Sequence, residues 1–200
     1  MTDNLKLYTY WRSSCSWRVR IALNYKDIPF DPIPKTPEYK EKNPNGVVPS
    51  LLFPDGKLVI QSSAILELVD ELYPQKPLLP KDPFKRATVR SICALIGSDI
   101  QPIQNLRVLN YVGETKQEWA AHFIDLGFQA LEAMLIKHGG KYCFGDEITL
   151  ADAYLVPQVY NAKRWGVDMS KYPVITAIND RLVELEPFKK SDPSVQVDAQ

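Results

Sequence analysis

Residues 5–23 read LKLYTYWRSSCSWRVRIAL, and this stretch decides the fold of the first part of the chain. Its beginning alternates apolar and polar residues and is rich in strand formers, which predicts a strand over residues 5–10. A polar break at Arg12, Ser13 and Ser14 follows. Apolar residues then recur at helical spacing from Cys15 to Leu23. The stretch therefore predicts a strand, a turn and a helix in succession.

The segments that follow predict a small mixed sheet. Residues 29–37 contain four prolines, so they form a poor helix and are predicted to hold one short strand before an irregular loop. Residues 50–53 and 57–60 flank a Pro-Asp-Gly turn and predict a β-hairpin. A helix is expected from Gln61 to Tyr73, where Pro74 ends it. Helices packed on a small sheet follow from this order.

The remainder of the chain predicts helices. A linker with four prolines spans 74–83. The pattern then predicts a helix over 86–112 with a kink at Pro102, a helix over 118–138, a helix opened by a capping box at residues 149–152 and a helix over 173–184. The apolar face expected for the second of these consists of Phe123, Leu126, Ala130 and Met134. The tail from Ser191 is polar and is predicted to fray. Two domains are thus expected, residues 1–80 and residues 81–200.

Composition excludes several classes of function. Hydrophobic residues make up 45% and charged residues 24%, which is ordinary for a soluble globular protein. The 24 Lys and Arg residues equal the 24 Asp and Glu residues, so no net basic field favours nucleic acid or an anionic membrane. No apolar stretch approaches the ~20 residues that cross a bilayer, and residues 1–5 lack the apolar core of a signal peptide. We expect a cytoplasmic protein.

Cysteine and histidine usage predicts neither a disulfide framework nor a metal site. The three cysteines Cys15, Cys93 and Cys143 are far apart and suit a reducing compartment. The two histidines have no cysteine pair nearby, so no metal-ligand spacing exists. Cys93 and Cys143 are expected in the core. Cys15 follows a turn at the start of a helix, where a low-pKa redox thiol is an alternative to a packed position.

The polar break carries the chemistry that the sequence suggests. Three serine hydroxyls and a thiol lie where a strand gives way to a helix, and the unpaired N–H groups there favour an anion. A serine hydroxyl beside them could donate a hydrogen bond to a thiolate. The alternative is that Ser13 or Ser14 merely caps the helix. The residues by themselves leave both interpretations open.

Residues 13–23 resemble the signature of the zeta-class glutathione transferases, or maleylacetoacetate isomerases. The likeness continues in order through residues 43–44, 48–49, 61–65, 100–106, 145–152 and 156–162, and spans roughly residues 5–190. The resemblance implies an α/β plus all-α architecture. This is the glutathione transferase fold, with an N-terminal thioredoxin-like domain and a C-terminal helical domain. It also implies a homodimer, glutathione as cofactor and a small acidic substrate.

The resemblance assigns roles residue by residue. Ser13 would activate the glutathione sulfur, with Ser14 and Cys15 beside it as the other catalytic residues. Arg164, helped by Arg12, would bind the acidic substrate. The glutathione site implied by the resemblance consists of Ser13, Ser14, Cys15, Ser16, Trp17, Arg18, Val48 before a cis Pro49, Gln61, Ser62, Asn105, Leu109, Asn110 and Tyr111.

The implied activity is glutathione-dependent cis–trans isomerisation of maleylacetoacetate to fumarylacetoacetate in tyrosine and phenylalanine catabolism, with glutathione transfer to α-halo acids beside it. One alternative is a general glutathione-conjugating transferase. Another is a non-catalytic interaction module of the same fold, against which the serine–cysteine run and the Gln61-Ser62 pair both speak.

Three further expectations bear on the site. The connection between Phe30 and Asn43 is shorter than is usual in this family, so some glutathione contacts have no counterpart. Arg18 and Arg20 are expected at the surface or in salt bridges. Trp17 is expected to pack.

Overall fold

The computed structural model describes residues 4–200, which form two compact units. The first unit extends to Pro77 and also includes Leu185–Gln200, and the second is Leu78–Glu184. The boundary expected at residue 80 lies close to Pro77, whereas Leu185–Gln200, expected in the second domain, belongs to the first unit. The polar start at residues 1–3, part of the segment expected to lack a signal peptide, lies outside the described residues.

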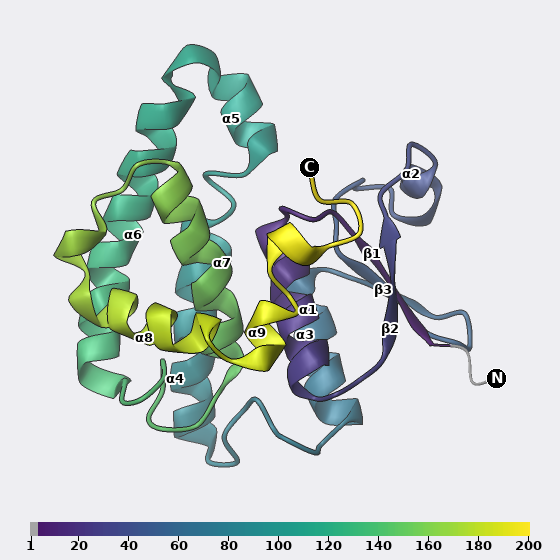
Figure 1. Cartoon of the computed structure of the whole chain (residues 1–200), viewed down its shortest axis with the longest axis horizontal. Coiled ribbons are helices and arrows are strands. Elements are labelled where there is room, and N and C mark those ends of the chain that lie inside the picture. The colour runs from purple at the N-terminus through teal and green to yellow at the C-terminus, as the bar shows by residue number, and fades with distance from the viewer. Residues whose placement is uncertain (1–3) are drawn as a thin grey trace. The chain divides into compact units, whose positions relative to one another are not determined.

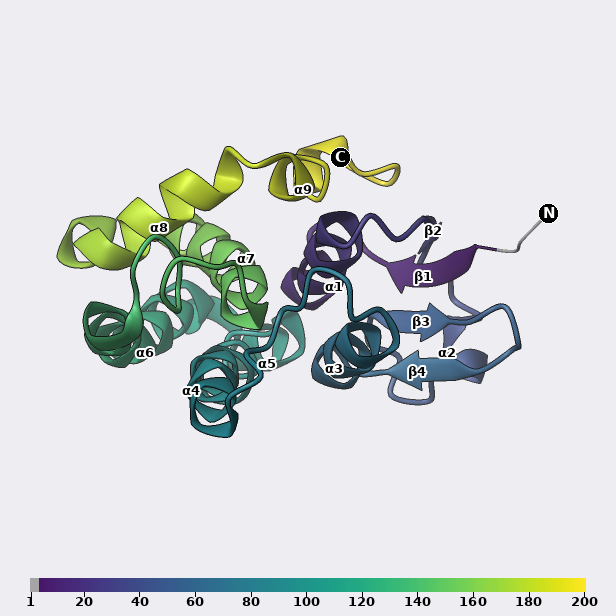
Figure 2. The same cartoon turned by 90° about the horizontal axis from the view of Figure 1, so that it is seen from below.

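The first unit is a four-stranded sheet with helices packed on it. Its elements are β1 (Leu5–Thr9), α1 (Ser14–Tyr25), β2 (Phe30–Pro34), α2 (Tyr39–Lys42), β3 (Ser50–Leu52), β4 (Leu58–Ile60) and α3 (Ser62–Leu72). The strand order is β2-β1-β3-β4, with β1 parallel to β2 and the other pairs antiparallel. Helices α1 and α3 pack side by side on one face of the sheet (Figures 1 and 2). The predicted strand–turn–helix unit, short strand and hairpin are confirmed.

The core of this unit follows from alternation in the strands and periodicity in the helices. Leu7 and Leu51 point inward from neighbouring strands and are fully buried. Val19 and Leu23 of α1 and Ile65 of α3 are equally buried. Burial of side chains of this size stabilises the fold by about 1.5–3 kcal/mol each. The start of α1 is therefore fixed against the sheet.

The second unit is helical. Its elements are α4 (Pro83–Ala94), the π-helical segment η1 (Leu95–Ile100), α5 (Leu106–Val112), a 3₁₀ turn (Gly113–Thr115), α6 (Lys116–His138), α7 (Leu150–Arg164), a 3₁₀ turn (Met169–Lys171) and α8 (Pro173–Val183). The predicted α/β plus all-α fold is confirmed. The C-terminal segment of the first unit adds α9 (Glu186–Lys189) and a 3₁₀ turn (Pro193–Val195).

The expected single helix over 86–112 is wrong. The chain changes from α-helix to π-helix at Leu95, turns through residues 101–104 and begins a new helix at Leu106. Pro102 cannot donate the backbone hydrogen bond that would continue the helix. Asn105 caps the new one, with its Oδ1 accepting the Arg107 N–H at 3.0 Å.

The apolar face expected for α6 is also wrong. Leu126 is 55% exposed and Ala130 is exposed, whereas Phe123 and Met134 are only half-buried. The buried stripe consists instead of Ala120, Ile124, Phe128, Leu131 and Leu135. The helix carries apolar residues on two faces, and periodicity alone does not say which face meets the core.

The capping box at the start of α7 is confirmed. Asp152 accepts the N–H of Thr149 at 2.8 Å and of Cys143 at 2.9 Å, and it also accepts the Thr149 hydroxyl. Burial raises the pKa of the Asp152 carboxyl, and these hydrogen bonds oppose that effect. Pro157 lies inside α7 without ending it. Cys93 and Cys143 are buried, as predicted.

The structure shows neither a membrane-spanning helix nor a metal-binding cluster in residues 4–200, the described part of the chain. No helix there is both long and apolar enough to cross a membrane. No group of three or more His, Cys, Asp or Glu side chains in the same range could hold a metal ion.

Candidate active site

Sheet pairing brings three loops of the first unit to one edge. Tyr8 in β1 pairs with Ser50 in β3, and Ser50 pairs with Ile60 in β4. The end of β1, the start of β3 and the end of β4 therefore lie at the same edge. The segments that leave this edge, residues 10–13, 48–49 and 61–62, carry most of the first-unit residues that the sequence singled out.

Ser13 is the N-cap of α1. Its Oγ accepts the Ser16 N–H at 3.2 Å, and its own N–H donates to the Tyr10 carbonyl at 2.9 Å. The capping interpretation is thus confirmed. The cap uses the serine oxygen as an acceptor, so its hydroxyl proton remains available as a donor. Capping and donation to a thiolate are therefore compatible at this one side chain.

The first turn of α1 supplies further donors. The N–H groups of Ser14 and Cys15 precede the first intrahelical hydrogen bond and have no partner within residues 4–200. The positive end of the dipole of this 12-residue helix also attracts an anion to these N–H groups. Cys15 itself is half-buried, and the Ser16 hydroxyl is fully buried with no hydrogen bond in the described part of the chain. The helix start thus favours a negative charge.

The side chains that follow face inward. Trp17 is 3% exposed, which confirms the packing role expected for it. Arg18 is 2% exposed and Arg20 is fully buried, so the first of the two alternatives expected for them, a surface position, is wrong. Arg20 tolerates burial because its guanidinium donates to backbone and hydroxyl oxygens, described below.

The short connection from Phe30 to Asn43 is folded compactly into β2, a turn and α2. Tyr39 is buried, and its hydroxyl donates to the Val47 carbonyl at 3.0 Å and also contacts the Ser50 hydroxyl. The buried Asn43 amide donates to the same carbonyl at 2.8 Å. These bonds hold the turn that precedes Val48.

Val48 and Gln61 fit a peptide ligand. The Val48–Pro49 bond is cis, as the resemblance implied. The N–H and C=O of Val48 have no hydrogen-bond partner within residues 4–200, so both can pair with a peptide backbone. Gln61 has a φ of 72° immediately before α3, and Ser62 begins that helix, where a carboxylate is favoured. The Val48 N–H and C=O and the N–H groups at the start of α3 suit a small peptide that bears a carboxylate and a thiol, as glutathione does.

The remaining predicted glutathione contacts belong to the second unit. Asn105 caps α5. Leu109 is fully buried, so its side chain serves the core of that unit. Asn110 is exposed and Tyr111 is 94% exposed. Their part in a glutathione site stays a prediction.

The two candidate substrate arginines both lie near tryptophans. The Arg164 guanidinium lies 4.7 Å from the Trp165 ring centre at the end of α7. The Arg12 guanidinium lies 5.1 Å from the Trp11 ring centre, and its Nε is buried without a hydrogen bond in the described chain. Stacking of this kind orients a guanidinium.

Comparisons with known proteins agree with this geometry. The family models described as "Glutathione S-transferase, N-terminal domain" and "Glutathione S-transferase, C-terminal domain" match residues 12–72 and 105–190. Maleylacetoacetate isomerase of Mus musculus is 50% identical over 96% of this chain and 94% of its own length.

Solved structures show the same likeness. Maleylacetoacetate isomerase from Anaeromyxobacter dehalogenans with bound GSH superposes with a TM-score of 0.92 at 39% identity, covering 98% of both chains. A second structure of that enzyme holds dicarboxyethyl glutathione and citrate in its active site. A maleyl pyruvate isomerase, described as a bacterial zeta-class glutathione S-transferase, has a TM-score of 0.93 at 40% identity, covering 98% of this chain and all of its own. This chain belongs to the zeta-class glutathione transferase and maleylacetoacetate isomerase family.

Proposed function

We propose that this chain catalyses the glutathione-dependent cis–trans isomerisation of maleylacetoacetate to fumarylacetoacetate in tyrosine and phenylalanine catabolism. The observation that carries the proposal is the start of α1, where the Ser13 hydroxyl and the N–H groups of Ser14 and Cys15 follow a strand that ends at the same sheet edge as the loop of Val48. Relatives of similar length bear this activity in their names.

The chain's own residues would favour an ionised sulfur at this point. A free thiol has a pKa near ~8.5, so only a few per cent is thiolate at neutral pH. Lowering that pKa by about two units corresponds to ~2.7 kcal/mol of preference for the thiolate. One hydroxyl donor and two helix N–H groups are enough to supply that preference. No general base is required at the sulfur.

Bound glutathione supplies the nucleophile that adds reversibly to the cis double bond, so the bond can rotate and no glutathione is consumed. Val48 would hold the peptide backbone of glutathione, and Gln61 and Ser62 would hold its γ-glutamyl carboxylate. The rest of the proposed glutathione site is Ser13, Ser14, Cys15, Ser16, Trp17, Arg18, Asn105, Leu109, Asn110 and Tyr111.

Arginines would orient the substrate, whose carboxylate and ketone groups match their fixed pattern of donors. Arg164 would bind the carboxylate, with Arg12 in support. A related enzyme has citrate in its active site beside a glutathione derivative, so an acidic ligand fits a site of this family.

A general glutathione-conjugating transferase is the second candidate, because the same ionised sulfur would also attack α-halo acids. A maleylacetone assay with and without glutathione separates the two. The isomerase predicts turnover that requires glutathione and consumes none of it. Consumption of glutathione in proportion to product would replace the isomerase with the transferase. Absence of turnover and of glutathione binding by titration would leave only an interaction module.

We also propose a cytoplasmic homodimer. A reducing compartment suits three cysteines that form no disulfide. Light scattering coupled to size exclusion measures the oligomeric state directly, and a mass near 22.8 kDa would mean a monomer and contradict the dimer.

A further inference from the structure

The C-terminal segment lies against the first helix of the first unit. Helix α9 packs beside α1, and the chain then runs on past the start of that helix (Figures 1 and 2). Ser191 is fully buried, accepts the Asn24 side-chain amide at 2.7 Å and donates to the Pro187 carbonyl at 2.6 Å. The tail expected to fray is therefore anchored, and that expectation is wrong.

Arg20 joins this segment to the loop before Ser13. Its Nε donates to the Ser191 carbonyl at 3.1 Å. Its two Nη atoms donate to the Thr9 hydroxyl at 3.1 Å, to the Tyr10 carbonyl at 3.5 Å and to the Trp11 carbonyl at 2.9 Å. The planar guanidinium thus contacts the tail on one side. On the other side it contacts Thr9 at the end of β1 and the first two residues of the loop over residues 10–13, called the catalytic loop from here on.

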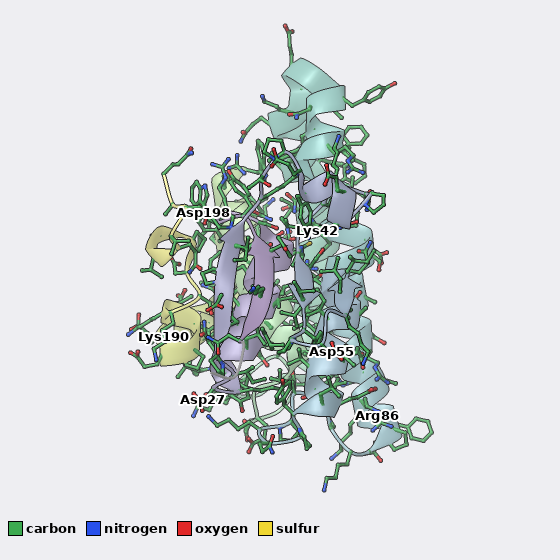
Figure 3. The ribbon with its side chains drawn as sticks, turned by 90° about the vertical axis from the view of Figure 1, so that its right-hand side faces the viewer. Asp27, Lys42, Asp55, Arg86, Lys190 and Asp198 are labelled. Atoms are coloured by element: carbon green, nitrogen blue, oxygen red, sulfur yellow. The ribbon has the colours of Figure 1, made fainter. Side chains whose placement is uncertain are left out.

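Asp198 makes a second contact between the C-terminal segment and the loop before Ser13. Its Oδ2 accepts the Trp11 N–H at 2.9 Å, across 187 positions of sequence. The Trp11 residue is therefore held through its N–H by Asp198 and through its carbonyl by Arg20. Figure 3 labels Asp198 near the end of the yellow C-terminal segment.

The turn held in this way leads directly to the proposed catalytic serine. The Tyr10 carbonyl that accepts Arg20 also accepts the Ser13 N–H at 2.9 Å. A displacement of Trp11 would therefore reach Ser13 through a single turn. Catalytic groups are sensitive to such displacement, since a misplacement of about 1 Å can reduce the rate by on the order of a hundredfold.

The charges around Arg20 also favour its contact with the C-terminal segment. Burial lowers the pKa of Arg20 to about 10, while the carboxylates of Asp198 and Asp192 act in the opposite direction. Arg20 therefore stays protonated at neutral pH. Both compensating carboxylates are on the C-terminal segment, so the segment supplies negative charge as well as hydrogen bonds to the buried cation.

We propose that residues 191–198 act as a clamp on the catalytic loop, in which Asp198 and Arg20 are positioning residues that set the place of Ser13. The clamp rests on the proposed function, because Ser13 is the group it positions. Removing the clamp should change the ionisation of bound glutathione and kcat while leaving the rest of the unit folded.

The test compares three full-length variants. Asp198→Ala removes the acceptor, and Asp198→Asn keeps an oxygen that can accept the Trp11 N–H. Val197→Ala alters a neighbouring side chain that is 72% exposed and serves as the control. The readouts are amide hydrogen exchange over residues 10–13, the pKa of the thiol of bound glutathione, and kcat and KM for maleylacetone. Near-UV circular dichroism checks the fold.

We expect Asp198→Ala to exchange faster at residues 10–13, to raise the bound thiol pKa and to lower kcat about tenfold at unchanged KM. The Asp198→Asn and Val197→Ala variants should match the parent chain in exchange rate, bound thiol pKa and kcat. The proposal is overturned by an Ala variant that behaves as the parent chain, by faster exchange without a change in thiol pKa, or by an Asn variant as impaired as the Ala variant. Absence of turnover in the parent chain would refute the proposed function, whereas exchange and thiol pKa would still decide on the clamp.

Discussion

Replacing Ser13 by alanine separates the two roles that this side chain combines. The cap to the Ser16 N–H at 3.2 Å is worth about 0.5–2 kcal/mol of stability. A hydrogen bond to a thiolate is worth about 1.5–3 kcal/mol, and each pKa unit corresponds to ~1.36 kcal/mol. The variant should therefore lose about 1 kcal/mol of stability and raise the bound thiol pKa by roughly one to two units.

The kinetic consequence follows from the fraction of thiolate. With a parent pKa near ~6.5, that rise lowers the thiolate fraction at pH 7 by about three- to twenty-five-fold. The kcat of Ser13→Ala should fall by a similar factor at pH 7 and recover as the pH approaches about 9. Isomerisation of maleylacetone across this pH range measures the effect, and urea unfolding measures the lost cap.

Two controls make the result specific. Asp82→Ala removes another helix N-cap, in which Asp82 accepts the Lys85 N–H at 2.8 Å, and should lose similar stability without loss of activity. Ser13→Thr keeps the hydroxyl and should retain most of the activity. If Ser13→Ala kept the kcat and the pH profile of the parent chain, Ser13 would be a cap only and the reasoning would be refuted.

Two further variants test the fold and the substrate site. Asp152→Ala should lower the free energy of unfolding by about 2–4 kcal/mol, because the buried N–H groups of Cys143 and Thr149 lose their acceptor. Urea unfolding measures this loss, with Glu147→Ala at an exposed position as the control. A loss no larger than that of the control would contradict the role of Asp152. Arg164→Ala should raise KM for acidic substrates more than for neutral electrophiles, with Lys163→Ala at an exposed position as the control. Equal effects on both kinds of substrate would argue against binding of the substrate carboxylate by Arg164.

Much of the first unit could be predicted because its signals are local. Alternation in residues 5–10, helical spacing after Cys15 and the Pro-Asp-Gly turn each depend on a few neighbouring residues. The serine run was found for the same reason, since the strand end and the helix start adjoin in sequence.

The clamp could not be predicted in this way. Trp11 and Asp198 are 187 positions apart, and nothing near either residue indicates the other. An arginine on a helix is usually exposed or in a salt bridge, and only the folded chain supplies the backbone acceptors of Arg20.

The helices of the second unit show a different limit. The sequence of residues 86–112 predicts one helix with a kink at Pro102, yet the backbone passes through a π-helix and a turn there. Gly127 of α6 permits close approach of the π-helix, because a Cβ at that position would lie only 2.3 Å from Ile100. Such close approach depends on tertiary packing, and so does the choice of the buried face of α6.

The proposed function requires that the opening of α1 stabilises an anionic sulfur on bound glutathione. Ultraviolet titration of the glutathione thiolate in the complex with this chain tests that claim without any substrate. We expect the thiol of bound glutathione to ionise with a pKa near ~6.5, about two units below that of a free thiol. A pKa equal to that of glutathione in buffer would contradict it.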